Sequence, residues 1–325
     1  MAPDNLTAKI SILPALIVAY KRLENTEKLI NECIKFGCPR IYLAVDKSTG
    51  TRDYQQEFYN LAERIHKRTS IPIYLWNRHQ NYGLAASMIS GISWFFEFEE
   101  AGYVLEDDLE VSESFFLWSS SLLSRVEDDD DVWLISGNNY QDRRTIQSTN
   151  YPLIWGWVTT RRKWKLMLES MLSSSLEFKS SVGLKVRTYW TLNYKKAAVG
   201  VVDSWAMLLA ATMRGNNKLC ILPPVNMVSN LGSDLAATHT QANIWPLREP
   251  VENLPIKNID ELELPTESTN QVNEFIEQHI YGINKFRFRW ILNITLLKLN
   301  RNLKLETIRV LLDFHPNFVK FEING

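Results

Sequence analysis

Apolar and polar residues follow one another in blocks along the first half of the chain. Short apolar runs, typical of buried strands, alternate with longer segments in which apolar residues recur every three or four positions, as in helices with one buried face. The predicted strands are residues 14–20, 40–45, 72–76, 103–109 and 132–136, and the predicted helices are residues 26–36, 55–67, 84–99 and 112–125. This order predicts an α/β fold with parallel strands joined by right-handed crossovers.

The second half is less regular. An aromatic stretch at residues 151–158 contains a glycine, and it is followed by predicted helices at 161–172 and 205–213 and a late strand at 219–224. Beyond about residue 245, prolines and acidic residues indicate a linker, and residues 272–299 are predicted to be mostly helical. We therefore predict one α/β domain over residues 1–245, with a linker and a helical C-terminal extension over residues 246–325.

Composition supports a globular protein. Hydrophobic residues make up 45% of the 325 residues and charged residues 22%, and the formal net charge of −1 gives no reason to expect a nucleic-acid partner. The three cysteines, Cys33, Cys38 and Cys220, lack the spacing of a disulfide framework, which favours a reducing compartment. No apolar run near the N-terminus resembles a secretory signal, so we expect a cytoplasmic protein.

Three adjacent carboxylates, Glu106, Asp107 and Asp108, follow the predicted strand at 103–109 directly. Adjacent anions repel one another and are costly to bury together, and a hard cation such as Mn²⁺ or Mg²⁺ would relieve this repulsion. The residues alone support a metal site and a solvated acidic turn equally.

Other polar residues lie where predicted strands end. Asp46 is placed to hold a ribose or base, but it serves equally well as a turn residue in the segment 46–50. Arg78 in the loop 77–83 is a candidate phosphate ligand, and Asn81 a candidate helix cap. A plain connecting loop is the less favoured interpretation of this segment.

The second half adds further candidates. Trp155, Gly156 and Trp157 would present flat walls with a close backbone approach, which suits a sugar ring, although a packed strand with a bulge is equally compatible. Asp203 directly precedes a predicted helix and could simply cap it. His239, between two threonines, is a candidate phosphate ligand or an ordinary structural histidine.

The order of these groups resembles the GT-A glycosyltransferases, and specifically the N-acetylglucosaminyltransferase I-like family of inverting enzymes. The resemblance spans about residues 14–240 and is most specific at residues 104–112 with Phe115 and Phe116. Shorter matches lie at residues 19–22, 155–157, 202–205 and 237–239. The family's second aspartate after the base position is Ser204 here, and nothing after residue 245 matches strongly.

This resemblance implies a GT-A-type, Rossmann-like mixed sheet and an enzyme that transfers a hexosyl or N-acetylhexosaminyl group. It implies Arg22 and Asp46 as nucleotide contacts, Glu106 and Asp107 as ribose and donor-sugar contacts, Asp108 as the metal ligand, Asp203 as the catalytic base, and Thr238 and His239 as a phosphate-contacting pair. The expected partners are a UDP-sugar donor and a glycan or glycolipid acceptor. The expected setting is bacterial-type polysaccharide biosynthesis.

Two other functions stay open. A sugar nucleotidyltransferase also uses carboxylates and Mg²⁺, but it favours a glycine-rich basic loop after the first strand, where this chain has Lys21 and Arg22. A non-catalytic carbohydrate- or membrane-binding protein is the second alternative. Residues 285–304 contain six basic residues and no Asp or Glu, which predicts peripheral contact with an anionic inner membrane face, or equally a helix packed on the domain.

Overall fold

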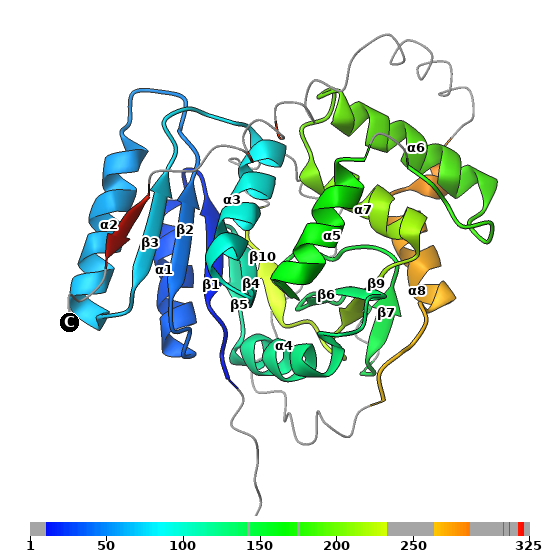
Figure 1. The fold of residues 1–325 in the computed structure, drawn as a ribbon, viewed down its shortest axis with the longest axis horizontal. Helices are drawn as coiled ribbons and strands as arrows, with labels where there is room; N and C mark the ends of the chain where they lie inside the picture. The colour runs from blue at the N-terminus through cyan, green and yellow to red at the C-terminus, as the bar shows by residue number, and fades with distance from the viewer. Residues whose placement is uncertain are drawn as a thin grey trace, which may run out of the picture.

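A nine-stranded sheet runs through the molecule and carries helices on both faces (Figure 1). The structure is a computed structural model that describes residues 11–141, 144–173, 176–232, 263–286, 308, 312 and 318–321. The sheet order is β11-β3-β2-β1-β4-β8-β6-β9-β7, and a separate two-stranded sheet pairs β10 with β5. The predicted α/β class, with a mixed sheet flanked by helices, is confirmed.

The first half forms the predicted parallel array. Its elements are β1 Ala15–Ala19, α1 Leu23–Lys35, β2 Ile41–Val45, α2 Tyr54–Thr69, β3 Ile73–Asn77, α3 Leu84–Phe98 and β4 Ala101–Glu106. Strand β1 pairs in parallel with both β2 and β4, with Ala15 opposite Ile41 on one side and Tyr103 on the other. Gly37 ends α1 with φ +93°, a backbone conformation that glycine adopts without strain.

The second half completes the sheet with mixed strand directions. Its elements are β5 Leu109–Val111, α4 Glu113–Val126, β6 Val132–Ser136, β7 Gln147–Thr149, β8 Trp157–Thr160, α5 Arg161–Met171, α6 Leu184–Ala198, α7 Trp205–Asn216, β9 Leu219–Leu222 and β10 Val228–Asn230. Strand β8 lies antiparallel between β4 and β6. Strand β6 therefore points the same way as β4, and so does β9, which pairs in parallel with β6.

Strand residues alternate between two apolar cores. In β1, Leu16 and Val18 enter the core that α3, α5, α6 and α7 cover, whereas Ala15 and Ile17 enter the core beneath α1, α2 and α4. A sheet covered on both faces needs apolar residues on both sides of each strand, which explains the continuous apolar runs in the sequence.

Three local predictions differ from the structure. The predicted strand 103–109 divides, because β4 ends at Glu106 and residues 109–111 leave the main sheet to pair with β10. Ser112, predicted as the first helical residue, is instead the N-cap of α4, which begins at Glu113, and its hydroxyl makes no capping hydrogen bond. Helix α6 was not predicted, because its apolar and polar residues do not separate onto two clear faces.

The described parts of the C-terminal segment contact the α/β domain, among other places, through helix α8 and strand β11. Helix α8 Asn270–Phe275 continues as the π-helical turn η2 Ile276–Ile280, and the 3₁₀ turn η3 Ile283–Lys285 follows Gly282 at φ +61°. The helix predicted over residues 272–299 is thus interrupted at Gly282, and most of the basic stretch 285–304 lies outside the described residues. Strand β11 Val319–Phe321 pairs antiparallel with β3. Within the described ranges, no helix is both long and apolar enough to cross a membrane.

Close packing between β4 and α3 predicts the effect of one substitution. A Cβ at Gly102 in β4 would collide with the Phe95 ring of α3 and lie 2.8 Å from the Pro14 carbonyl oxygen. We expect Gly102→Ala to lower the free energy of unfolding by about 1–3 kcal/mol, the usual cost of overfilling a core. Urea denaturation measures this loss. Gly183→Ala is the control, because no atom lies within 4 Å of its added Cβ. Equal midpoints for the two variants would contradict the prediction.

Candidate functional site

Polar residues gather where the parallel strands of the main sheet end. Residues 20–22 follow β1, Asp46 follows β2, Arg78 follows β3, and Asp107 and Asp108 follow β4. Because β3, β2, β1 and β4 are parallel neighbours, their carboxyl ends meet at one edge of the sheet. Strand β8 runs in the opposite direction, so Trp155 and Gly156, which precede it, belong to the same edge. The structure thus brings together most of the predicted site residues.

Asp107 is held by the end of β1. Its Oδ2 accepts a hydrogen bond from the Tyr20 backbone N–H at 2.8 Å, and its Oδ1 accepts one from Arg22 Nη1 at 3.0 Å. The same Nη1 lies 3.5 Å from Asp108 Oδ2. One arginine therefore contacts two of the three adjacent carboxylates.

Asp108 is held from the other side by the turn after β10. Asn230 Nδ2 donates to Asp108 Oδ1 at 3.3 Å, and the Leu231 backbone N–H donates to the Asp108 carbonyl oxygen at 2.7 Å. A Cβ at Gly232 would collide with the Asp108 carboxylate, so only glycine fits there without a shift. Neither Asn230 nor Gly232 was predicted as a site residue; the available signal was an Asn-x-Gly that begins at the last residue of a strand.

Burial makes these carboxylates costly to ionise. Burial, reinforced by the charges of Asp108 and Asp107, raises the pKa of Glu106 to about 8. Burial and the charge of Asp107 raise the pKa of Asp108 to about 6, against the opposing effect of Arg22. Three ionised carboxylates beside one arginine would carry a net charge of −2, which a divalent cation would neutralise.

The carboxylate oxygens at the end of β4 are suited to a hard cation that is held by few protein ligands. No three His, Cys, Asp or Glu side chains converge into a preformed metal site in the part of the chain that the structure describes. Asp108 is the carboxylate best placed to bind, because Asp107 is already engaged by Tyr20 and Arg22. Diphosphate and water oxygens would have to complete the coordination of such an ion.

Asp46 is nearly enclosed, with 5% of its surface exposed. Its carboxylate accepts hydrogen bonds from the backbone N–H of Tyr82, at 3.1 and 3.2 Å, and from that of Lys47 at 3.1 Å. Burial raises the pKa of Asp46, and the nearby Arg78 charge opposes that rise. Both predicted roles remain compatible, because a carboxylate that organises a turn can still accept a further hydrogen bond from a ligand.

Arg78 lies beneath this edge, in contact with α3. Only 1% of its surface is exposed, and its guanidinium donates to the Ser87 carbonyl oxygen at 2.7 Å and to the Ser87 and Ser90 hydroxyls at 3.1 Å each. It stacks on Trp76 at 4.3 Å, and burial lowers its pKa to about 10. A direct phosphate contact would require it to leave these partners. The phosphate role of Arg78 stays a prediction. In the structure, Arg78 connects the end of β3 to α3 through its hydrogen bonds to Ser87 and Ser90.

Asp203 caps a helix other than the one it precedes. Its two carboxylate oxygens accept hydrogen bonds from the backbone N–H groups of Leu84 at 2.8 Å and Ala85 at 3.1 Å, the first residues of α3. Ser204 caps α7 instead, through Met207 N–H at 3.3 Å. Asn81, the predicted cap of α3, accepts from the Gly83 N–H. Asp203 therefore lies at the start of α3, which follows the carboxyl end of β3, and its role as the base stays a prediction.

The Trp-Gly-Trp segment divides between the core and the edge. Trp157 has no exposed surface and packs nearly parallel to Trp205, so it lies in the core, where it offers no wall to a sugar. Gly156 has φ +62° and accepts a hydrogen bond from Gly137 N–H at 2.7 Å. Trp155 is half-buried and meets Tyr140 edge-on at 5.7 Å. Only Trp155 and Gly156 remain candidates for substrate contact.

Two predicted residues cannot be placed. Thr238 and His239 lie outside the described residues. Gly232, which lies beside Asp108, is the last described residue before them.

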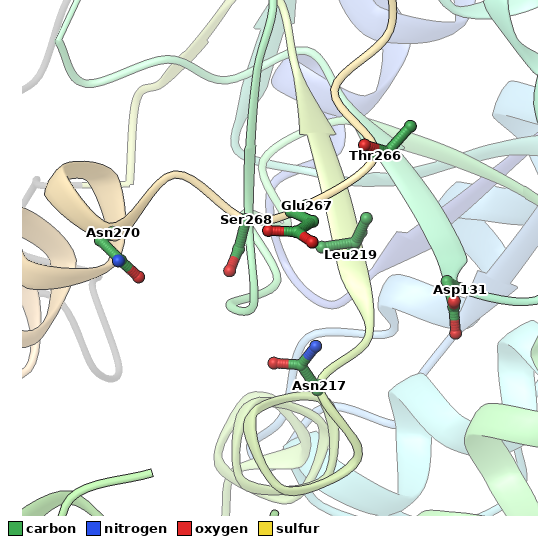
Figure 2. A pocket seen from close by; sticks show the side chains of 7 residues that line it. All are labelled: Asp131, Asn217, Leu219, Thr266, Glu267, Ser268 and Asn270. Carbon is green, nitrogen blue, oxygen red and sulfur yellow. The ribbon is translucent and has the colours of Figure 1, made fainter. Parts of the chain in front are cut away.

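A separate hollow lies at the opposite edge of the sheet. Figure 2 shows its seven lining residues, which come from the starts of β6 and β9, the end of α7 and the segment before α8. They are Asp131, Asn217, Leu219, Thr266, Glu267, Ser268 and Asn270. Its volume is about 280 Å³, and it shares no residue with the carboxylate edge.

Comparison with known proteins gives distant structural likenesses only. No known family profile and no curated protein matches the chain. Among solved structures, the mannosyltransferase PcManGT from Pyrobaculum calidifontis, in complex with GDP-Man and Mn²⁺, aligns with 14% identity and a TM-score of 0.38 over 56% of this chain and 52% of its own. The present chain thus spans about half the length of that enzyme.

Two further structures show similar likeness. The galactosyltransferase LgtC, in complex with donor and acceptor sugar analogs, has 11% identity and a TM-score of 0.35, covering 62% of this chain and 71% of its own. UDP-glucose pyrophosphorylase complexed with UDP-glucose has 10% identity and a TM-score of 0.38, covering 69% and 94%. The neighbours thus include glycosyltransferases and a nucleotidyltransferase, and likenesses this distant carry no argument about the activity of this chain.

The raised pKa of Glu106 predicts a pH-dependent cost in stability. The folded protein binds the Glu106 proton more tightly than the unfolded chain does. The stability that this tighter proton binding contributes is present at low pH and is lost as the pH rises through about 8. Between pH 5 and pH 8.5, Glu106→Gln should therefore gain stability relative to the natural protein, by up to about 4 kcal/mol, since each pKa unit corresponds to about 1.4 kcal/mol.

Urea denaturation in EDTA at both pH values measures this gain. Glu113→Gln is the control, because it removes the same charge from the exposed first turn of α4. Parallel pH profiles for Glu106→Gln and the natural protein would contradict the prediction.

Proposed function

We propose that this chain is a metal-dependent inverting glycosyltransferase. It would move a sugar from a nucleotide-diphosphate sugar, in the first instance a UDP-sugar, to a hydroxyl of a glycan or glycolipid. The observation that carries the proposal is the carboxylate group at the end of β4, which faces Arg22 and shares its sheet edge with Asp46 and Asp203.

The anionic end of the donor fits the Asp108 side of this edge. Asp108 would hold Mn²⁺ or Mg²⁺, which when bound supplies Lewis-acid stabilisation to the departing diphosphate. Arg22 would add a second positive charge for the same phosphates. Both groups are fixed in place, Asp108 by the 230–232 turn and Arg22 by Asp107.

The nucleoside end fits the Asp46 side. A carboxylate in this position accepts a hydrogen bond from a ring N–H of the base, which uracil offers and the corresponding ring nitrogens of cytosine and adenine do not. Glu106 and Asp107 directly precede Asp108 at the end of β4, and by the resemblance to known transferases they would contact the ribose and the donor sugar.

Asp203 is the proposed general base. In an inverting transfer, the acceptor oxygen forms a bond to the anomeric carbon while the bond to the diphosphate oxygen breaks with its electron pair. The acceptor proton would pass to the Asp203 carboxylate. Hydrogen bonds from the N–H groups of Leu84 and Ala85 fix the orientation of this carboxylate.

The loop after β1 disfavours nucleotidyl transfer. Helix α1 begins at Leu23, directly after Arg22, so no glycine-rich loop separates the first strand from the first helix. Phosphate cradles of that kind need several consecutive backbone N–H groups in an open loop.

A panel of UDP-sugars with Mn²⁺ tests the proposal. We expect slow release of UDP from one donor, abolished by EDTA. We also expect Asp108→Ala to lose Mn²⁺-dependent UDP affinity in calorimetry, while Glu110→Ala, which removes a carboxylate outside the group of three, retains it. Unchanged UDP affinity in Asp108→Ala would refute the metal assignment. Pyrophosphate formed from UTP and a sugar 1-phosphate would instead indicate a nucleotidyltransferase, and neither product a binding protein.

Asp203 gives a second prediction. Asp203→Asn should keep nucleotide-sugar affinity and lower the transfer rate by roughly 10²–10⁴, the usual contribution of a general base. Because Asp203 also caps α3, the control is Ser204→Ala, which removes the cap of α7 at the next position and should cost about 1 kcal/mol of stability without loss of transfer. Normal turnover in Asp203→Asn would overturn the assignment.

A further inference from the structure

The C-terminal segment binds four consecutive residues, 148–151, that lead toward the candidate site. The Ser148 hydroxyl donates to the Glu267 carbonyl oxygen at 2.6 Å, and Thr269 N–H donates to the Ser148 carbonyl oxygen at 3.1 Å. The side chain of Asn273, 5% exposed, accepts from the Thr149 hydroxyl at 2.7 Å. These contacts join α8 to β7.

Asn273 makes a reciprocal pair with Asn150. The Asn150 backbone N–H donates to Asn273 Oδ1 at 2.9 Å, and Asn273 Nδ2 donates back to Asn150 Oδ1 at 3.0 Å. Both residues are buried, so each loses water on folding and depends on the other for its hydrogen bonds.

Glu277, four residues after Asn273, holds the next position. The Tyr151 hydroxyl donates to Glu277 Oε1 at 2.6 Å, and Arg214 Nε of α7 donates to the same oxygen at 3.2 Å. Trp190 Nε1 of α6 donates to the Tyr151 hydroxyl at 3.2 Å. Tyr151 is thus fixed by three elements that are distant in sequence.

The segment combines hydrogen bonds with apolar packing. Its residues Thr266, Glu267, Ser268 and Asn270 line the 280 Å³ hollow together with Asn217 and Leu219 (Figure 2). The apolar side chains of Val272 and Ile276 enter the core, while Asn273 and Glu277 bind the 149–151 backbone and side chains.

A short buried path leads from Tyr151 to Trp155. Residues 151–153 are buried, and Trp155 and Gly156 follow at the carboxyl edge. A Cβ at Gly156 would lie 3.6 Å from Leu105, the residue before Glu106, so this turn abuts the carboxylate strand.

We propose that Asn273 and Glu277 are positioning residues that form a clasp on residues 149–151, and that this clasp fixes Trp155 and Gly156 as the acceptor-side wall of the site. The inference that the wall faces an acceptor sugar rests on the proposed transferase function. The clasp itself rests only on the contacts above. The C-terminal segment is then part of the working site and not an appendage to it.

The clasp predicts a selective kinetic defect. Asn273→Ala removes the hydrogen bonds to Thr149 and Asn150, and Glu277→Gln removes the charge that binds Tyr151 and Arg214. In both variants, we expect the acceptor KM to rise about tenfold, with donor KM and Mn²⁺-dependent UDP affinity unchanged, because no contact to Arg22, Asp46 or Asp108 is altered. Asn273→Asp keeps the accepting oxygen and should restore part of the acceptor affinity.

Hydrogen–deuterium exchange provides a readout that does not depend on activity. Peptides covering residues 148–157 should exchange faster in Asn273→Ala and Glu277→Gln. Glu274→Gln is the matched control, since Glu274 is exposed on the same helix and its loss should change neither exchange nor kinetics. If Asn273→Ala does not fold, Tyr151→Phe removes one hydroxyl from the same network and serves in its place.

The outcomes separate the clasp from the transferase function. Unchanged exchange at residues 148–157 overturns the clasp, whatever the activity. Faster exchange with an unchanged acceptor KM overturns the link to the acceptor wall, as does an equal rise in donor KM. If no donor supports transfer, the proposed function fails, and faster exchange in both variants but not in Glu274→Gln still supports the clasp.

Discussion

The structure depends on how three negative charges are accommodated at the end of one strand. Glu106, Asp107 and Asp108 lie together at the end of β4, and Arg22, which follows the neighbouring β1, contacts Asp107 and Asp108. A parallel pairing of β1 with β4 is what brings that arginine within reach. Burial, reinforced by the remaining negative charge, raises the pKa of Glu106, and the same imbalance keeps the cluster sensitive to an incoming cation. A solvated acidic turn would show neither the burial nor the shared arginine.

The sequence predicted the parts of the fold that arise from local periodicity. Strands β1 to β4 and their helices follow apolar runs and helical spacing that need no knowledge of the rest of the chain, and the carboxylates were placed at a strand end for the same reason. Helix α6 escaped prediction because its apolar residues do not form one stripe. The break at Gly282 depends on a positive φ that a single glycine in a helical pattern does not reveal.

Partners were harder to predict than positions. Besides the base role, the sequence allowed Asp203 to cap the helix that follows it, yet it caps α3, whose first residues lie more than a hundred positions earlier. Arg78 was predicted as a phosphate ligand, but two serines on α3 bind it in the interior. Trp155 lies before the turn at Gly156, and Trp157 lies after it as the first residue of β8. The side chain of Trp157 is fully buried in the core. In each case the residue type was informative, whereas the contact depended on tertiary packing.

Strand β11 affects how readily one copy of the protein can pair with another through the edge of the sheet. By pairing with β3, residues 319–321 occupy the backbone N–H and C=O groups along one flank of the sheet, so β3 is no longer its outer strand. The new outer strand is three residues long and carries Lys320, whose charge lies over the Tyr74 ring. Short outer strands with a lysine are poor templates for another chain. Residues 319–321 thereby make this flank of the sheet a poor site for edge-to-edge pairing, an effect quite apart from the chemistry of the carboxylate edge.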